Sequence, residues 1–355
     1  MNQSYKKGDL TGKALTVQGP INPEQLGKVI CHEHLLIDFR VVLQDPPDKE
    51  DLPLKNEKIN LENLGWIRTF WNCNEDNLII DDIDISRKEI MDFSTSGGGT
   101  IVDVTSTGLH RQPEKLKLLS QDTKVNIIMG SGYYVDSSLP NYFETETAEM
   151  ISKRIINDIF VGVESSKIHS GIIGEIGCSY PLTKNERKSL EAAVIAQNTT
   201  GAPLLIHPGR HETSPIEIIK FIEKVGADLS NTVMGHIERT VFQLDTLEQL
   251  ANKEVYLNFD LFGHESSFYP LAPKSFMPSD HQRIEIINHL IGWGYVEKVL
   301  LGHDICSKHR LKKYGGHGWD HILKRVLPRM IGSGISYNQI NDMIIENPKK
   351  LLTFK

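Results

Sequence analysis

Residues 28–34 read KVICHEH, a short apolar run that ends in two histidines. The chain continues with seven more apolar runs of this kind, each bounded by glycine, proline or polar residues, as is typical of buried parallel strands. These runs are GTIVDVTSTG (99–108), VNIIMGSGYY (125–134), GIIGEIG (171–177), APLLIHPG (202–209), TVMGHIE (232–238), VYLNFDLFG (255–263) and KVLLGHDI (298–305).

Stretches with apolar residues at three- and four-residue spacing separate the runs and predict helices. They cover residues 86–97, 114–121, 147–163, 183–201, 215–226, 246–253, 281–294 and 335–348. Eight strands that alternate with helices, without a linker, favour one α/β domain over residues 1–355, folded as a (β/α)8 TIM barrel. An open doubly wound sheet is the competing architecture.

Two segments are longer than a bare barrel requires. Residues 37–80 and 264–280 are expected to be long loops over the C-terminal face, the first with a helix around NLGWIRTFWN. Long loops at one end of a barrel commonly cover a functional site.

The composition narrows the class of protein. A net charge of -7 argues against a nucleic-acid partner, and no stretch approaches the length of a membrane span. The four scattered cysteines suggest reduced thiols, and the N-terminus has no apolar signal region. A cytoplasmic enzyme is therefore expected.

Residues with metal-binding side chains stand at the ends of five of the eight runs, where a barrel carries its active site. Side chains two apart on a strand share a face, so both histidines of HEH can enter the barrel mouth. By the same alternation, Cys31, Glu33 and His303 are expected to point toward the helices. The candidate ligands are His32, His34, Glu175, His207, His236 and Asp304.

Four imidazoles and two carboxylates suit two divalent ions, with Zn²⁺ as the expected metal. Two such ions can share a bridging hydroxide that attacks a polarised C=O or P=O group. Asp304 is the expected catalytic residue, because it could accept the proton of that nucleophile and pass one to the leaving group. Each histidine alone could be structural, but six such residues at strand ends indicate a metal centre.

At these residues the chain resembles the phosphotriesterase family of the amidohydrolase superfamily. The resemblance rests on CHEHL (31–35), GEIG (174–177), IHPGR (206–210), MGHIERT (234–240) and GHDI (302–305), and it extends nearly end to end. It implies a (β/α)8 barrel in which His32, His34 and Asp304 hold the more buried ion, and His207 and His236 the more exposed one.

The bridging position departs from the phosphotriesterases proper, which carry a carboxylated lysine where this chain has Glu175. This difference makes organophosphate hydrolysis doubtful as the main activity. The animal branch of the family, which this chain resembles more closely, implies an amidase that cleaves N-acetyltaurine, with other N-acyl taurines or amino acids as further substrates.

Such an anionic N-acyl substrate needs a cationic clamp, and four cations follow the ligand-bearing runs: Arg210, Arg239, Lys308 and Arg310. Arg239 is the first choice, because it lies three residues past His236. Tyr133 and Tyr134 could line the pocket or donate a hydrogen bond to the acyl oxygen.

Two other functions compete with amide hydrolysis. The same metals could serve a lactonase or a phosphoester hydrolase, or the barrel could bind a small acidic ligand without turnover. The complete ligand set, which includes a base, argues against pure binding. The oligomeric state is left open, with a homodimer as one option.

Overall fold

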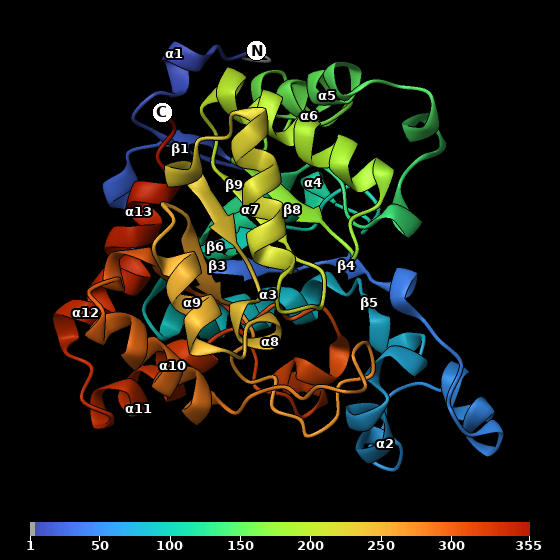
Figure 1. Ribbon diagram of the computed structural model, residues 1–355. Helices are drawn as coiled ribbons and strands as arrows, with labels where there is room; N and C mark the ends of the chain where they lie inside the picture. Colours follow the sequence, from blue (N-terminus) through green and yellow to red (C-terminus); the bar gives the residue numbers. More distant parts are fainter. Residues whose placement is uncertain (1–3) are drawn as a thin grey trace.

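Eight parallel strands form the central sheet of the computed structural model, which describes residues 4–355 (Figure 1). Neighbours in the chain are neighbours in the sheet, and the backbone N–H of Asp304 donates to the carbonyl of His32 at 3.0 Å, which brings the last strand beside the first. The strands are β3 (Lys28–Glu33), β6 (Gly98–Asp103), β7 (Asn126–Ser131), β8 (Ile172–Gly177), β9 (Leu204–His207), β10 (Thr232–Met234), β11 (Tyr256–Phe259) and β12 (Val299–Leu301). The predicted (β/α)8 barrel is confirmed.

Helices lie at all the predicted places, with ends that differ from the expected ones by a few residues, and two short helices, over Ile237–Thr240 and Leu327–Gly332, were not predicted. The C-terminal helical stretch is divided by a π-helical turn over Asp342–Glu346. The outer helices are α3 (Ile83–Thr95), α4 (Pro113–Thr123), α5 (Ala148–Phe160), α6 (Lys184–Thr200), α7 (Ser214–Val225), α8 (Ile237–Thr240), α9 (Leu244–Ala251), α10 (Asp280–Gly292), α11 (Leu327–Gly332), α12 (Tyr337–Asn341) and α13 (Asn347–Leu352).

Helix α6 shows how local sequence sets these boundaries. The hydroxyl of Thr183 accepts from the backbone N–H of Glu186, and the Glu186 carboxylate accepts from the backbone N–H of Thr183. This reciprocal cap satisfies donors that the first helical turn leaves free. Gly201, at φ 76°, ends the helix in the left-handed conformation that glycine adopts readily.

The barrel interior is filled by a cluster to which every strand contributes at least one buried side chain, including Val29 and Cys31 of β3. Cys31 therefore points inward, and the expectation that it faces the helices is wrong. The cause is a register shift between Ile30 and Glu33, where β3 has one residue more than β6. Such a bulge reverses the alternation of side chains.

A second bulge lies in β8 between Ile173 and Ile176, opposite Leu204 and Ile206 of β9. Both isoleucines belong to the outer core, so the extra residue lets Glu175 turn toward the barrel axis. Bulges are common next to active sites because they redirect single side chains. These two bulges include His32 and Glu175, which the sequence predicts as ligands.

The two long segments lie over the C-terminal face. The first contains a short antiparallel pair, β4 (Ile37–Asp38) and β5 (Ile79–Ile80), and the helix α2 (Leu64–Thr69) in the region expected. Residues 264–280 follow β11, and Phe268 packs edge-to-face on Phe70 with ring centroids 5.9 Å apart. The two segments therefore meet.

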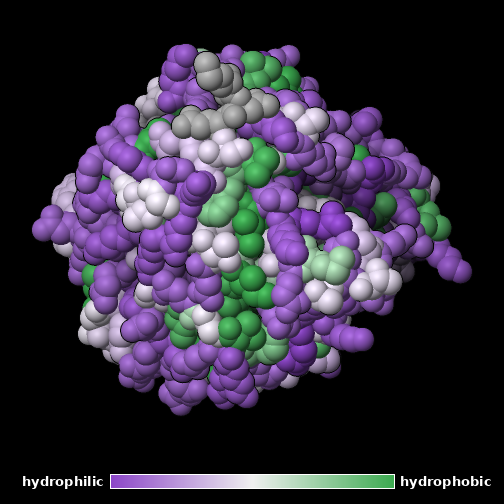
Figure 2. Space-filling model, turned by 90° about the horizontal axis from the view of Figure 1, so that it is seen from above, coloured by the Kyte–Doolittle hydropathy of each residue, from purple (hydrophilic) through white to green (hydrophobic). Residues whose placement is uncertain are grey.

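The opposite end carries the C-terminus and the described segments that precede the barrel (Figure 1). Helix α1 (Lys7–Leu10) and the hairpin of β1 (Ala14–Thr16) and β2 (Gly19–Ile21) precede the barrel, and the backbone N–H of Gly12 donates to the carbonyl of Phe354. Figure 2 shows a mostly hydrophilic face with a narrow apolar band. Within residues 4–355, no helix has the length and apolarity needed to cross a membrane.

Candidate metal centre

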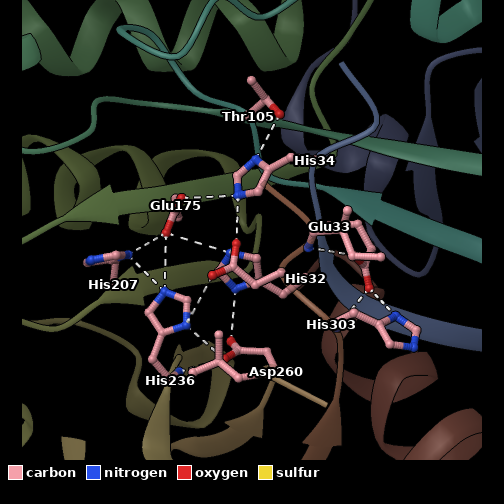
Figure 3. Close-up of polar contacts among 12 residues, drawn as sticks. His32, Glu33, His34, Thr105, Glu175, His207, His236, Asp260 and His303 are labelled. Atoms are coloured by element: carbon pink, nitrogen blue, oxygen red, sulfur yellow. Dashed lines mark hydrogen bonds and ion pairs between the residues drawn. The ribbon is translucent and has the colours of Figure 1, made fainter. Parts of the chain in front are cut away.

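The carboxylate of Glu175 lies among all four candidate histidines (Figure 3). Its Oε2 is 2.8 Å from Nδ1 of His207 and 3.6 Å from Nε2 of both His32 and His236. Its Oε1 is 3.4 Å from Nε2 of His34. The bulge in β8 thus places one carboxylate where it can reach two neighbouring groups of imidazoles.

Asp304 closes the group on the opposite side. Its Oδ1 lies 3.2 Å from Nε2 of His34 and 3.8 Å from Nε2 of His32, and its Oδ2 lies 3.9 Å from Nδ1 of His236. Asp304 has φ 49° and His236 has φ 52°, so both lie in the left-handed region. Non-glycine residues held there cluster at functional sites, since surrounding contacts must offset the strain.

The six predicted residues form two adjoining groups, each with ligand atoms within 4.8 Å of one another. His32, His34 and Asp304 make one group, and Glu175, His207 and His236 make the other. All except Asp304 are buried, and 15% of the Asp304 side chain is exposed. Each group has the ligand types and closeness that could hold a divalent ion.

Asp260 is a seventh member that the sequence analysis missed. Its Oδ2 accepts from Nδ1 of His32 at 2.8 Å, and its Oδ1 accepts from both Nδ1 and the backbone N–H of His236 at 2.8 and 2.9 Å. One carboxylate thereby orients two rings and leaves their Nε2 atoms for the centre. Its position at the end of the VYLNFDLFG run was the available signal.

The surrounding groups fix the other rings. Nδ1 of His34 is 2.9 Å from the hydroxyl of Thr105. Glu33 and His303, predicted to point away from the ligands, bond to each other at 2.6 Å between Oε1 and Nδ1 (Figure 3). The Nε2 of His303 accepts from the backbone N–H of Ile322, so the ring is held between the barrel and its outer layer.

The electrostatics of the centre favour carboxylates in their charged form. Burial alone would raise the pKa of Glu175, but the imidazoles, led by His207, hold it well below its ordinary value. The pKa of Asp260 is likewise lowered, because His236 and His32 outweigh its burial. For His34, the carboxylates of Asp304 and Glu175 overcome burial and raise the pKa to about 10.

A narrow cavity, here called the inner cavity, adjoins Glu175, His207 and Asp304. Its wall carries Arg210, Arg239 and Arg310, together with Phe39, Trp71, Tyr134, Leu261, His264, Tyr269, Met277 and Cys306. Arg239 donates to Pro208 O and lies 3.1 Å from Nε2 of His207, and Arg210 Nε donates to the Tyr269 hydroxyl at 2.6 Å. No carboxylate of the described chain forms an ion pair with any of the three guanidinium groups.

Two predicted substrate contacts are placed elsewhere. The ammonium of Lys308 pairs with Asp76 at 2.9 Å, and neither residue lines the inner cavity. The hydroxyl of Tyr133 bonds to that of Tyr142 at 2.9 Å, and it is Tyr134 that lines the cavity and packs on His207. Neither Lys308 nor Tyr133 therefore lines the inner cavity, and both side chains are engaged by other residues.

Comparison with known proteins agrees with this geometry. Residues 12–352 match the model of the phosphotriesterase family. A phosphotriesterase-related protein of Nematostella vectensis is 44% identical over 97% of this chain and 99% of its own length. An N-acetyltaurine hydrolase of Xenopus tropicalis is 42% identical over 98% and 99%.

Among solved structures, a resiniferatoxin-binding protein from Rhodobacter sphaeroides superposes with a TM-score of 0.94 at 33% identity, over 99% of this chain and 97% of that one. Sequence and structure thus agree over nearly the whole length, including every strand that carries a candidate ligand. The chain belongs to the phosphotriesterase family and is a hydrolase of that family.

Proposed function

We propose that this hydrolase is a binuclear metal-dependent amidase that cleaves N-acetyltaurine to taurine and acetate. The observation that carries the proposal is the position of Glu175 within 3.6 Å of all four histidines, next to a cavity with three unpaired arginines. The relatives named N-acetyltaurine hydrolase supply the substrate.

The residues of the centre fit two divalent ions, for which Zn²⁺ is the expected metal. Nε2 of His32 is buried without a hydrogen-bond partner, although Asp260 binds the other ring nitrogen. An orphaned buried nitrogen of this kind is costly unless a ligand completes it. When bound, a metal pair supplies an activated water and polarises the scissile carbonyl.

Each of the two groups of candidate ligands would hold one ion. His32, His34 and Asp304 would hold one ion, and His207 and His236 the other, with Glu175 shared between them. Asp260 would keep His32 and His236 in the form that presents Nε2 to the ions. A glutamate at the shared position needs no carboxylation before the centre assembles.

Asp304 is the proton carrier of the proposed mechanism. Its side chain is 15% exposed, whereas that of Glu175 is 3% exposed, and it lines the inner cavity. An Asp304 oxygen accepts the proton of the attacking water and delivers it to the amide nitrogen as the C–N bond breaks. The reaction balances, because one amide and one water molecule give one carboxylate and one amine.

Arg239 and Arg210 hold the sulfonate of the substrate. Both guanidinium groups line the inner cavity without a carboxylate partner, and a planar guanidinium donates paired hydrogen bonds to an oxyanion. Fixing the anion places the amide at one distance from the centre, which favours the two-carbon link between sulfonate and amide nitrogen in taurine. The four cysteines are free, which suits the cytosol as the site of the reaction.

The test compares three substrates on purified, metal-loaded protein: N-acetyltaurine, a long-chain lactone and an aryl phosphotriester. We expect taurine release to exceed the other two rates, and Asp304→Asn to abolish it while substrate still binds. Rapid lactone opening without taurine release would contradict the amidase and support the lactonase.

A further inference from the structure

A second cavity, of about 510 Å³, adjoins the inner one and is here called the outer cavity. Its wall is formed by the loop after β11, by the region of α2 and by the segment after β12. The two cavities share five wall residues: Trp71, His264, Tyr269, Met277 and Arg310. A ligand in the outer cavity would therefore lie next to the inner cavity and its metal centre.

The wall of the outer cavity carries uncompensated positive charge. Arg68, Arg310 and Arg325 line it, against the single carboxylate of Glu265. That carboxylate accepts from the backbone N–H of Asp280 at 2.7 Å. Arg68 donates to the carbonyl of Gly315, and within residues 4–355 none of the three arginines forms an ion pair. The protein carries a net charge of -7, so this local excess of cations runs against the overall charge of the chain.

Four ring and guanidinium nitrogens of this wall are buried without a hydrogen-bond partner: Nε of Arg310, Nε2 of His264, Nε2 of His317 and Nδ1 of His321. Burial lowers the pKa of both His264 and His317 well below the ordinary value, so these two rings are neutral near pH 7. Burial lowers the pKa of Arg310 only to about 10, so it stays cationic. Oxygens of an anion would satisfy this set.

We propose that the outer cavity is a second anion-binding site, which takes a small organic carboxylate or sulfonate before it passes to the metal centre. Arg68 and Arg325 are exposed and would attract the anion. Arg310 and His264, which belong to both cavities, would hold its oxygens, and Trp71 and Met277 would contact its carbon atoms. The passage to the metal centre rests on the proposed function, whereas binding in the outer cavity requires neither bound metal nor amide hydrolysis.

Crystals soaked in selenate, whose anomalous scattering locates it, test the site directly. We expect selenate in the outer cavity in contact with Arg310 or His264. In solution, calorimetric titration with methanesulfonate should show two binding events in the wild type. The double variant Arg68→Gln/Arg325→Gln should weaken one of them at least fivefold and leave the other unchanged.

The matched control is Lys115→Gln/Lys220→Gln, which removes two exposed charges from residues that line neither cavity. It should bind methanesulfonate as the wild type does. Selenate in the inner cavity alone, or equal affinities in the two double variants, would overturn the proposal. A further readout is kcat/KM for N-acetyltaurine, which should fall only in the arginine variant, with kcat unchanged. The binding measurements need no turnover and so separate this proposal from the amidase.

Discussion

Asp260 holds His236 by two hydrogen bonds to a single oxygen: Oδ1 accepts from the ring Nδ1 at 2.8 Å and from the backbone N–H at 2.9 Å. The backbone of His236 has φ 52°, a conformation that a histidine adopts only under constraint. The same carboxylate orients His32 through its other oxygen. Asp260 thereby links the two groups of candidate ligands, because it binds one histidine of each group through the ring nitrogen that faces away from the centre.

Replacement of this carboxylate should weaken the centre without removing a ligand. Asp260→Asn keeps the shape but cannot accept from two ring N–H groups equally well, and we expect metal affinity and kcat to fall about 10- to 100-fold. Metal titration and steady-state kinetics measure the two effects. Unchanged metal affinity in a folded variant would show that Asp260 does not position the rings.

The anion clamp gives a prediction for KM. Arg239→Lys keeps the charge but loses the planar fork, and a charge-assisted hydrogen bond contributes about 1.5–3 kcal/mol, so KM for N-acetyltaurine should rise at least tenfold. Lys308→Gln is the comparison, since Lys308 pairs with Asp76 outside the inner cavity. Equal effects of the two substitutions would contradict the placement of Arg239.

The interior of the barrel leaves no room at Gly130. A Cβ there would lie 2.1 Å from the carbonyl oxygen of Gly174, next to Glu175. Gly130→Ala must displace the strand that carries the shared carboxylate, and overpacking of this kind typically costs about 1–3 kcal/mol. Urea denaturation should show this loss. Gly65→Ala in α2 meets open space and should not destabilise the protein.

Much of the barrel follows from the alternation of apolar runs and amphipathic stretches, because each strand must be buried on both faces. The ligands were found because parallel strands end at one rim. The local backbone conformations that orient these side chains toward the centre were not predictable. Bulges in β3 and β8 and left-handed residues at His236 and Asp304 aim four of the six side chains, and no residue pattern marks them.

Errors in the sequence analysis have the same physical origin. Cys31 was assigned outward because strict alternation was assumed across the bulge. Lys308 was assigned to the substrate, but its partner Asp76 comes from a segment 232 residues earlier, which spacing cannot reveal. Asp260 was overlooked because its role depends on contacts with His32 and His236, which its position near the end of a strand run does not reveal by itself.

A buried glutamate outside the site makes stability depend on pH. Burial raises the pKa of Glu89 from 4.5 to about 6, and its Oε2 has no hydrogen-bond partner. The folded state therefore binds the proton more tightly than the unfolded state, and this group lowers the free energy of unfolding as pH rises from about 4.5 to about 6. The shift of about 1.5 units corresponds to at most about 2 kcal/mol.

Glu89→Gln cannot ionise and should remove this dependence. The difference in the free energy of unfolding between variant and wild type, from urea denaturation, should grow in favour of the variant between pH 4.5 and pH 7. Taking the difference cancels the titration of the metal centre, which both proteins share. A difference that stays constant over this range would show that Glu89 does not titrate as described.

The most direct test of a binuclear centre joined by Glu175 is the metal content of the purified protein, measured by elemental analysis beside Glu175→Ala. The account predicts about two equivalents of divalent metal per chain in the wild type. It predicts one equivalent or less in the variant, with circular dichroism showing that the fold is kept. Two equivalents in Glu175→Ala, or hydrolysis by a wild type free of metal, would contradict it.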